Sequence, residues 1–188
     1  DDGVTICATA TERISTSDSD QFVDNRGDVF FGVALNLIFA YGTKRPEICG
    51  ELSEIVVEEL DHFRQVLALL EQRGIPFRAQ KPASYGRKLN DLVRAGEPES
   101  TVDRLLVASL IEARSCERFK RLSEGLKDEY LCHFYRRFME SEAGHYTLFI
   151  ELAETYIEKE KVRMRWKEWL AYEAQIMQEM EIRGDRIH

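Results

Sequence analysis

The sequence lacks the cysteine spacings that mark a zinc site or a disulfide framework. Its cysteines form no CxxC pair and no zinc-ribbon pattern. In a helical protein, isolated cysteines of this kind are typically reduced and buried as small apolar residues, so we expect a cytosolic chain with free thiols. The four cysteines are Cys7, Cys49, Cys116 and Cys132.

Long apolar runs and an excess of basic charge are missing too. The longest apolar stretch, VALNLIFAY, is interrupted by Asn36 and is too short to span a membrane, so we expect no membrane association. The opening residues are mostly Asp, Ser and Thr, unlike a secretory signal. A net charge of −8 argues against a surface devoted to nucleic acid, although it leaves room for a local basic patch.

Strand-type alternation is absent, and the patterns that are present are helical. Residues 1–27 are polar without periodicity and predict an irregular lead-in, whereas residues 28–188 predict a single helical domain. Ser100 and Asp103 have the spacing of a capping box at the start of a long helix. The fold class predicted is therefore all-α. The expected helices cover roughly residues 30–41, 46–73, 88–95, 100–124, 131–152 and 160–182.

Two of the four histidines are each preceded by a glutamate at minus three. Glu59 and His62 lie in EELDHF, and Glu142 and His145 lie in SEAGHY. On a helix, this spacing turns both side chains of a pair to one face. Both pairs continue apolar stripes, so the periodicity directs all four side chains into the core.

A further glutamate, Glu112, occupies a core-facing position on another long helix. An unpaired buried carboxylate costs several kcal/mol, so each such acid needs a proton, a cation or a metal. Inward-facing glutamates with two ExxH pairs are the pattern of di-iron and di-manganese helical bundles. By contrast, Glu58 lies off the stripe and is expected to be a solvated surface acid. We expect Glu117 to form a salt bridge with an arginine of its own helix, one of Arg114, Arg118 and Arg121.

The string IEARSCERF, at residues 111–119, is much more distinctive than an ExxH pair. Together with EELDHFRQVLALLEQRGI at 58–75 and FYRRFMESEAGHYTLFIELA at 134–153, it resembles the MiaE family over roughly residues 33–180. The resemblance implies a ferritin-like four-helix bundle with additional short and C-terminal helices. It also implies a tRNA-modifying monooxygenase that hydroxylates the isopentenyl group of 2-methylthio-isopentenyl-adenosine beside the anticodon. The implied cofactor is a pair of iron ions, with O2 as co-substrate and electrons from a separate redox protein.

Carried over by motif, the resemblance implies five iron ligands, which are the residues that the periodicity also selects. Manganese satisfies similar ligands. The family's sixth ligand is a glutamate on the first helix, and an ungapped count places Gly27 there, with Asp28 beside it. Asp28 is the candidate replacement. The five ligands are Glu59, His62, Glu112, Glu142 and His145.

Basic residues on the helices are candidate contacts for tRNA phosphates, although charged runs are usually solvated helix faces. Two other functions fit parts of the sequence. A ferritin- or rubrerythrin-like ferroxidase or iron-binding protein shares the ligand set without the IEARSCERF string, and a non-enzymatic interaction bundle is favoured by the missing first-helix glutamate. The candidate phosphate contacts are Arg87, Lys88, Arg94, Arg114, Arg118, Lys120, Arg121, Arg136 and Arg137.

Overall fold

The structure of the protein, a computed structural model, describes residues 34, 37–38, 42, 46–77 and 84–179. All regular structure within these residues is helical, which confirms the predicted all-α class. Within them no helix is both long and apolar enough to cross a membrane. The lead-in and Asp28 lie outside the described residues, as does most of the helix expected near 30–41. The elements are α2 (Glu47–Gln72), α3 (Ser84–Asn90), α4 (Glu99–Gly125), α5 (Glu129–Glu154) and α6 (Lys159–Glu179).

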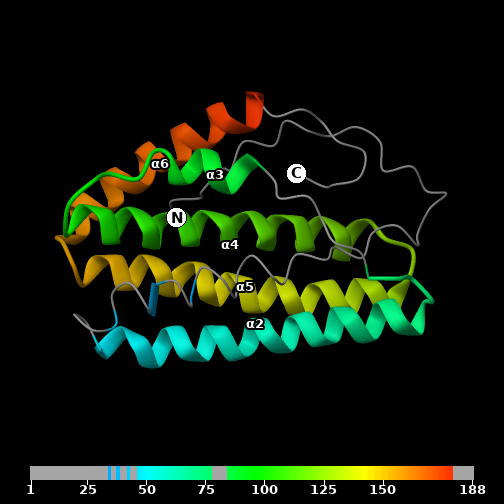
Figure 1. Ribbon diagram of the computed structural model, residues 1–188. Helices are drawn as coiled ribbons and strands as arrows, with labels where there is room; N and C mark the ends of the chain where they lie inside the picture. Colours follow the sequence, from blue (N-terminus) through cyan, green and yellow to red (C-terminus); the bar gives the residue numbers. More distant parts are fainter. Residues whose placement is uncertain (1–33, 35–36, 39–41, 43–45, 78–83, 180–188) are drawn as a thin grey trace.

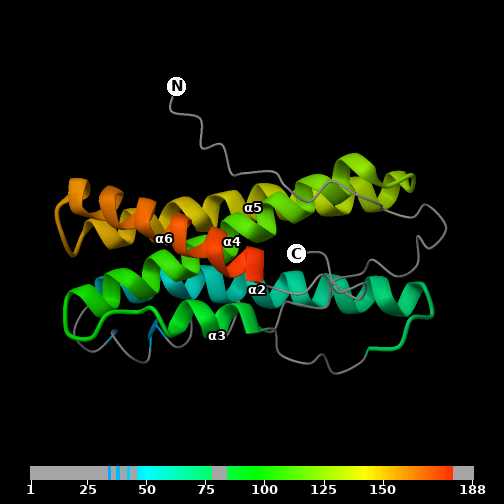
Figure 2. The ribbon, with the colours of Figure 1, turned by 90° about the horizontal axis from the view of Figure 1, so that it is seen from above.

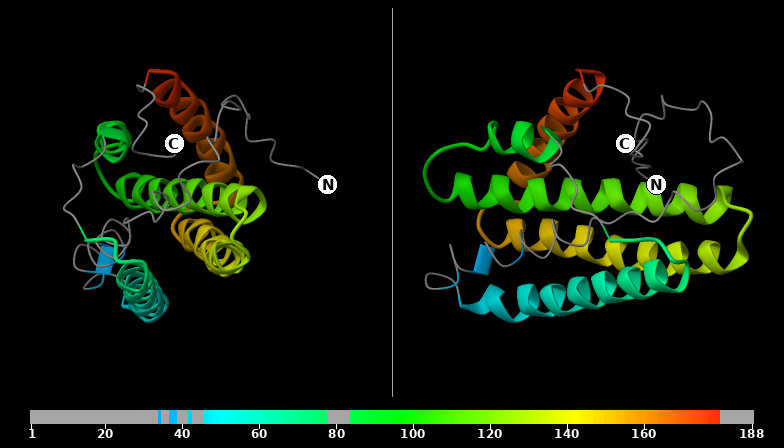
Figure 3. Two further views of the ribbon diagram at one scale, coloured as in Figure 1. Left: turned by 90° about the vertical axis from the view of Figure 1, so that its right-hand side faces the viewer. Right: turned by 45° about the vertical axis from the view of Figure 1, so that its right-hand side comes forward.

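The long helices α2, α4 and α5 run roughly parallel or antiparallel to one another (Figure 1). A short connection after α4 reverses the chain, so that α5 returns antiparallel along it, and α2 lies beside α5 in the direction of α4 (Figures 1 and 3). Helices α3 and α6 lie on the other side of α4, with α6 crossing it obliquely (Figure 2). The space among α2, α4 and α5 is therefore the interior in which a site can form.

The ends of α2 and α5 follow from their sequences. Pro46 precedes the first turn of α2, and Gly74 follows its last turn with φ of 65°, a left-handed conformation that glycine adopts at little cost. At α5, the Asp128 side chain accepts a hydrogen bond from the backbone N–H of Leu131 and caps the helix. These stop and start signals are local, which is why the sequence predicts these helices well.

Two details of the sequence prediction were wrong. The short helix α3 begins at Ser84 and ends at Asn90, earlier than predicted, because the following residues form turns. The capping box does not form, since Asp103 is fully buried and bonded to Arg94 and Arg165 instead.

Among the described residues, the apolar core forms two separate clusters. The larger joins α2, α4, α5 and α6 and includes Leu52, Leu105, Phe149 and Trp169. The smaller, around Phe138, joins the C-terminal half of α2, the end of α4 and the start of α5. Along each long helix, the two clusters are separated by a level that carries the inward-facing glutamates.

Candidate metal centre

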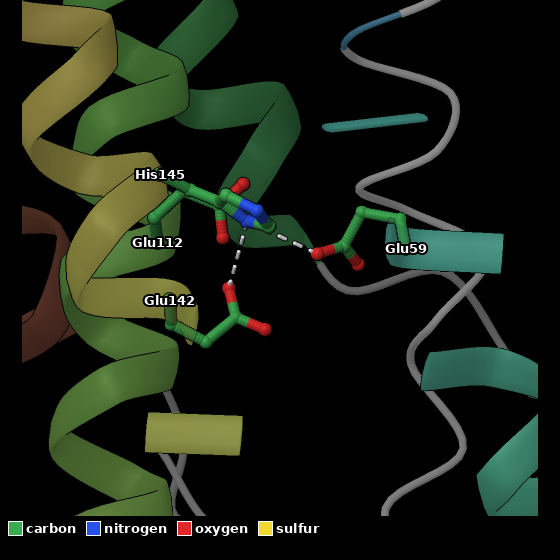
Figure 4. A group of neighbouring side chains, drawn as sticks. All are labelled: Glu59, Glu112, Glu142 and His145. Atoms are coloured by element: carbon green, nitrogen blue, oxygen red, sulfur yellow. Dashed lines mark ion pairs between the residues drawn. The ribbon is translucent and has the colours of Figure 1, made fainter. Parts of the chain in front are cut away.

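Three helices bring buried glutamates to one point between the two apolar clusters (Figure 4). Glu59 comes from α2, Glu112 from α4, and Glu142 and His145 from α5. The four residues are at most 5% exposed, and each offers one ligand atom within 4.8 Å of the others. The structure thus brings together four of the five ligand candidates that the helical periodicity selects.

The fifth candidate, His62, lies at the edge of this group. Its Nδ1 is 3.3 Å from Oε1 of Glu59 and 3.6 Å from Oε1 of Glu142. The Nδ1 of His145 approaches the same Glu59 oxygen at 3.3 Å and lies 3.9 Å from Oε2 of Glu142. Glu142 therefore presents one oxygen toward each imidazole.

The donor atoms of this group are the ones expected of metal ligands. Five of them are buried without a hydrogen-bond partner among the described residues, and each belongs to a different member of the group. Buried polar atoms of this kind are rarely left unsatisfied, so the cluster requires a further species. Carboxylate and imidazole groups suit divalent iron or manganese. The five atoms are Glu59 Oε1, His62 Nδ1, Glu112 Oε2, Glu142 Oε2 and His145 Nδ1.

The electrostatics of the group agree with a need for cations. Burial raises the pKa of Glu112 well above its usual range, and the neighbouring Glu142 and Glu59 raise it further. Burial also raises the pKa of Glu142. Burial opposes ionisation of Glu59 as well, but the adjacent imidazoles of His145 and His62 outweigh this and lower its pKa. Without cations, the carboxylates compete for protons, and bound cations would remove that repulsion.

Glu58, expected to be a solvated surface acid, has a specific partner across the helix interface. Its Oε2 lies 2.9 Å from Nε2 of His145, and Ser141 Oγ donates a hydrogen bond to the same oxygen at 3.2 Å. The expected exposure is confirmed, since the Glu58 side chain is 55% exposed. The contact with His145 was not predicted, because helical periodicity describes one helix and says nothing of the neighbour's rotation. The only available signal was the position of Glu58 immediately before Glu59.

Two of the predicted phosphate contacts are engaged inside the protein. Arg118 is only 7% exposed and donates to Ser115 Oγ. Arg114 is ion-paired with Glu173 of α6 and with Glu117. Arg118 is buried and the Arg114 side chain is only 17% exposed, so neither guanidinium is a free cation on the surface.

The expected salt bridge of Glu117 is confirmed with two of its three candidate partners. Its carboxylate pairs with Arg114 at 2.8 Å and with Arg121 at 3.0 Å. The third candidate, Arg118, points into the protein. Glu117 therefore belongs to a structural ion-pair network and takes no part in the cluster of metal-ligand candidates.

The other predicted phosphate contacts lie at or near the surface. Arg87, Lys120, Arg136 and Arg137 are exposed, with Arg137 donating to Gln65 of α2. Lys88 pairs with Glu179 at 2.9 Å, and Arg121 pairs with Glu117. Arg94, also exposed, is bonded to Asp103 through its backbone N–H and its guanidinium.

The described cysteines are free thiols and are half-buried, where full burial was expected. Cys116 donates to the carbonyl oxygen of Met139, and burial raises the pKa of its thiol. A thiol with a raised pKa is a poor nucleophile, so Cys116 is unsuited to chemistry at the adjacent cluster. The remaining cysteines described are Cys49 and Cys132.

Comparisons with known proteins point to one enzyme family. A family model described as tRNA-(ms2io6A)-hydroxylase (MiaE) matches residues 30–188. The tRNA 2-(methylsulfanyl)-N(6)-isopentenyladenosine(37) hydroxylase of Pseudomonas putida is 40% identical over 155 residues, which are 80% of this chain and 75% of that protein. The protein of the same name from Salmonella typhimurium is 40% identical over 100 residues, covering 53% of this chain and 37% of its own length.

Among solved structures, the chain resembles protein 43 with aldehyde deformylating oxygenase activity from Synechococcus. The TM-score is 0.78 at 35% identity, and the match covers 83% of this chain and 77% of that one. The same helical arrangement thus occurs in a protein whose described activity is that of an oxygenase.

Proposed function

This chain belongs to the MiaE family of tRNA hydroxylases, and we propose that it hydroxylates the isopentenyl group of 2-(methylsulfanyl)-N6-isopentenyladenosine in tRNA. The family match and the relatives named for this activity support the reaction, and they favour it over the ferroxidase alternative. The ferritin-like bundle predicted from the sequence agrees with the oxygenase-like fold. The observation that carries the proposal is the meeting of five buried, unsatisfied donor atoms from α2, α4 and α5.

We propose that these donors hold two iron ions. Glu142, with one oxygen toward each imidazole, and Glu59, with Oε1 beside both, would hold the ions together with the two histidines. A carboxylate oxygen of Glu112 lies within 4.8 Å of a ring nitrogen of His145. Bound iron would supply the activation of O2 for insertion into an unactivated C–H bond, which side chains cannot perform. Asp28, outside the described residues, is the proposed additional ligand, and manganese is a proposed substitute.

The surroundings of the cluster suit a reaction that must exclude water. His62 is stacked on Phe138 with ring centroids 4.5 Å apart, and Phe138 belongs to the smaller apolar cluster. Leu110, two residues before Glu112 on α4, is buried and belongs to the larger apolar cluster. Phe63, half-buried beside His62, extends this apolar wall toward the surface, where Phe77 contacts it edge-on. These groups would also favour an apolar isopentenyl chain over water.

The base must leave its stack to reach a buried centre, and an anticodon loop already presents unstacked bases. We propose that exposed basic residues contact the neighbouring phosphates, because most of the affinity of a protein for nucleic acid comes from such contacts. Arg114 and Arg118 are left out because they are the least exposed of the predicted contacts, at 17% and 7%. The proposed contacts are Arg87, Lys88, Lys120, Arg121, Arg136 and Arg137.

The proposed electron donor and the proposed cellular compartment follow from the reaction. Insertion of one oxygen atom from O2, with release of the other as water, consumes two electrons. A separate redox protein is therefore proposed as the donor. Because tRNA is the substrate, we propose that the enzyme works in the cytoplasm.

The test is to incubate the iron-loaded protein with tRNA, a chemical reductant and 18O2, and then to analyse the nucleosides. The expected result is a modified adenosine that has gained one labelled oxygen atom in its isopentenyl group. Unmodified tRNA that lacks this group serves as the control and should gain nothing. If loaded protein oxidises ferrous iron but leaves the isopentenyl group unchanged, the proposal is wrong and the ferroxidase alternative gains support.

A further inference from the structure

The two histidines of the cluster are held in different ways. The His145 ring is fixed at both nitrogens, with Nδ1 facing the Glu59 carboxylate and Nε2 lying 2.9 Å from Glu58 Oε2. The His62 ring faces the cluster through Nδ1 and is fixed by stacking on Phe138. Within the described part of the chain, no acid reaches the other nitrogen of His62. The two ExxH pairs are thus similar in sequence but have different supporting contacts.

Glu58 is placed to select the tautomer of His145. A neutral imidazole carries one N–H and one lone pair, and a metal ligand must offer its lone pair to the metal. With Nδ1 directed at the cluster, the N–H belongs on Nε2, where Glu58 Oε2 accepts it. Carboxylates that accept a hydrogen bond from a ligand histidine orient the ring and make its free nitrogen more basic.

The Glu58 carboxylate is itself held in place. Ser141 Oγ donates to the same Oε2, so two donors one turn apart on α5 hold one acceptor on α2. Glu58 also directly precedes Glu59, so a single turn of α2 supplies both a ligand and the group that orients a ligand from the opposite helix. The Glu58 side chain is 55% exposed, which leaves this contact open to solvent and to mutation without disturbing the core.

We propose that Glu58 is a positioning residue for the metal position that His145 serves, and that its loss weakens metal binding there while leaving the His62 position little changed. This inference rests on the proposed metal centre and adds the group that makes its two positions unequal.

The experiment is a metal titration of the metal-free protein under anaerobic conditions, with Fe2+ and with Co2+ as a spectroscopic probe. The variants are Glu58→Ala, Glu58→Gln and Ser141→Ala, and Glu54→Gln is the control, since Glu54 is an exposed acid one turn away on α2. Loss of such an outer partner typically lowers metal affinity by about 10–100-fold. We expect a decrease of that size in one of two binding steps for Glu58→Ala, a smaller one for the amide and serine variants, and none for the control.

A double-mutant cycle shows which of the two metal-binding steps Glu58 affects. In a His145→Ala background, Glu58→Ala should cause no further loss, whereas in a His62→Ala background it should cause its full loss. The 15N signals of His145 in metal-free protein, above the pKa of the ring, should report an Nε2–H tautomer that Glu58→Ala converts to a mixture. Far-UV circular dichroism verifies folding, and Glu58→Gln carries the test if Glu58→Ala fails to fold.

The outcomes separate the two proposals. If the unmodified protein takes up no metal, the metal centre itself is wrong. If it binds two ions but folded Glu58→Ala binds both with unchanged affinity, or loses both steps equally, only the role of Glu58 is refuted. An Nδ1–H tautomer in the unmodified protein would refute it as well.

Discussion

The imidazole rings of His62 and His145 lie 6.3 Å apart, tilted by 39°, on two different helices. Each ring turns its Nδ1 toward the same oxygen of Glu59. Paired metal ions in proteins are typically about 3.5–4 Å apart, and two histidines at this spacing suit one ion each. The distance between the two rings therefore supports a dinuclear centre more directly than the similarity of the two ExxH sequences does.

The first prediction concerns unequal binding of the two ions. Glu112 groups with Glu59, Glu142 and His145, so Glu112→Gln should weaken one binding step by at least the 10–100-fold that loss of an outer partner causes. His62→Ala should weaken the other. Anaerobic calorimetry with elemental analysis measures both steps. Glu124→Gln, an exposed acid on the same helix as Glu112, is the control and should bind as the unmodified protein does.

The second prediction is that metal affinity falls as the pH is lowered. Metal must displace protons from Glu112 and Glu142, whose pKa values burial raises. Burial lowers the pKa of His145, but the adjacent carboxylates of Glu59 and Glu142 outweigh burial and raise it, so this ring must release a proton too. Titrations in buffers of different ionisation enthalpy should show net proton release. Heats independent of the buffer would contradict the prediction.

The third prediction is that the metal-free protein loses stability as the pH rises. The pKa of Glu112, raised by burial and by Glu142 above the usual 4.5, makes the folded state hold a proton that the unfolded chain releases. This contribution is complete below pH 4.5 and is lost as the pH climbs toward the raised pKa. Bound metal should offset the loss, so the Tm difference between loaded and chelated protein should widen with pH.

Calorimetry across this pH range tests the third prediction. For a chain of this length, a change of 1 kcal/mol in the free energy of unfolding shifts Tm by about 2–4 °C. Glu112→Gln is neutral at every pH and should flatten the dependence in metal-free protein. A Tm difference that stays constant with pH would show that the carboxylates are not protonated as described.

The fourth prediction concerns the buried acid Asp103, which joins Arg94, Arg165 and Trp169. Burial opposes its ionisation, but the hydrogen bonds from Arg165 and Arg94 outweigh burial and lower its pKa to about 2 from the usual 3.8. At pH values above the usual pKa, this shift contributes about 2 kcal/mol to the free energy of unfolding. The contribution is lost as the pH falls through about 2.

Asp103→Asn should therefore lower the free energy of unfolding at neutral pH by about 3–5 kcal/mol, because Arg165 is left without its buried carboxylate partner. Glu168, an exposed acid that also accepts from Arg165, is the matched control, and Glu168→Gln should cost about 0–1 kcal/mol. Urea unfolding measures both variants. Equal decreases in the free energy of unfolding for the two variants would show that the burial of Asp103 does not determine its contribution to stability.

The fifth prediction concerns tRNA binding by the exposed Arg136 of α5. If it contacts a phosphate, Arg136→Gln should weaken tRNA binding regardless of the modification and reduce the slope of log affinity against log salt by about 0.7. Filter binding over a range of salt concentrations measures this slope. Lys167→Gln, on the exposed face of α6, is the control. An unchanged slope for Arg136→Gln would remove this residue from the proposed contacts.

Much of the candidate site could be predicted from the sequence because its logic is local to each helix. A period of 3.6 residues places Glu59, Glu112 and Glu142 on apolar stripes, and all three are buried. The plus-three spacing then adds the two histidines. Stop and cap signals such as Gly74 and Asp128 are equally local, so the long helices were predicted within a few residues.

What only the tertiary structure decided depends on how one helix is rotated and placed against another. Glu58 reaches His145 across the interface of α2 and α5, and Asp103 is enclosed by α6 and the segment before α4. Arg118 is buried for the same reason. The hydrophobic pattern of a helix specifies which face is inward, because that depends only on its own period. It does not specify which side chain of a neighbour will be opposite, since that contact is set when the helices pack.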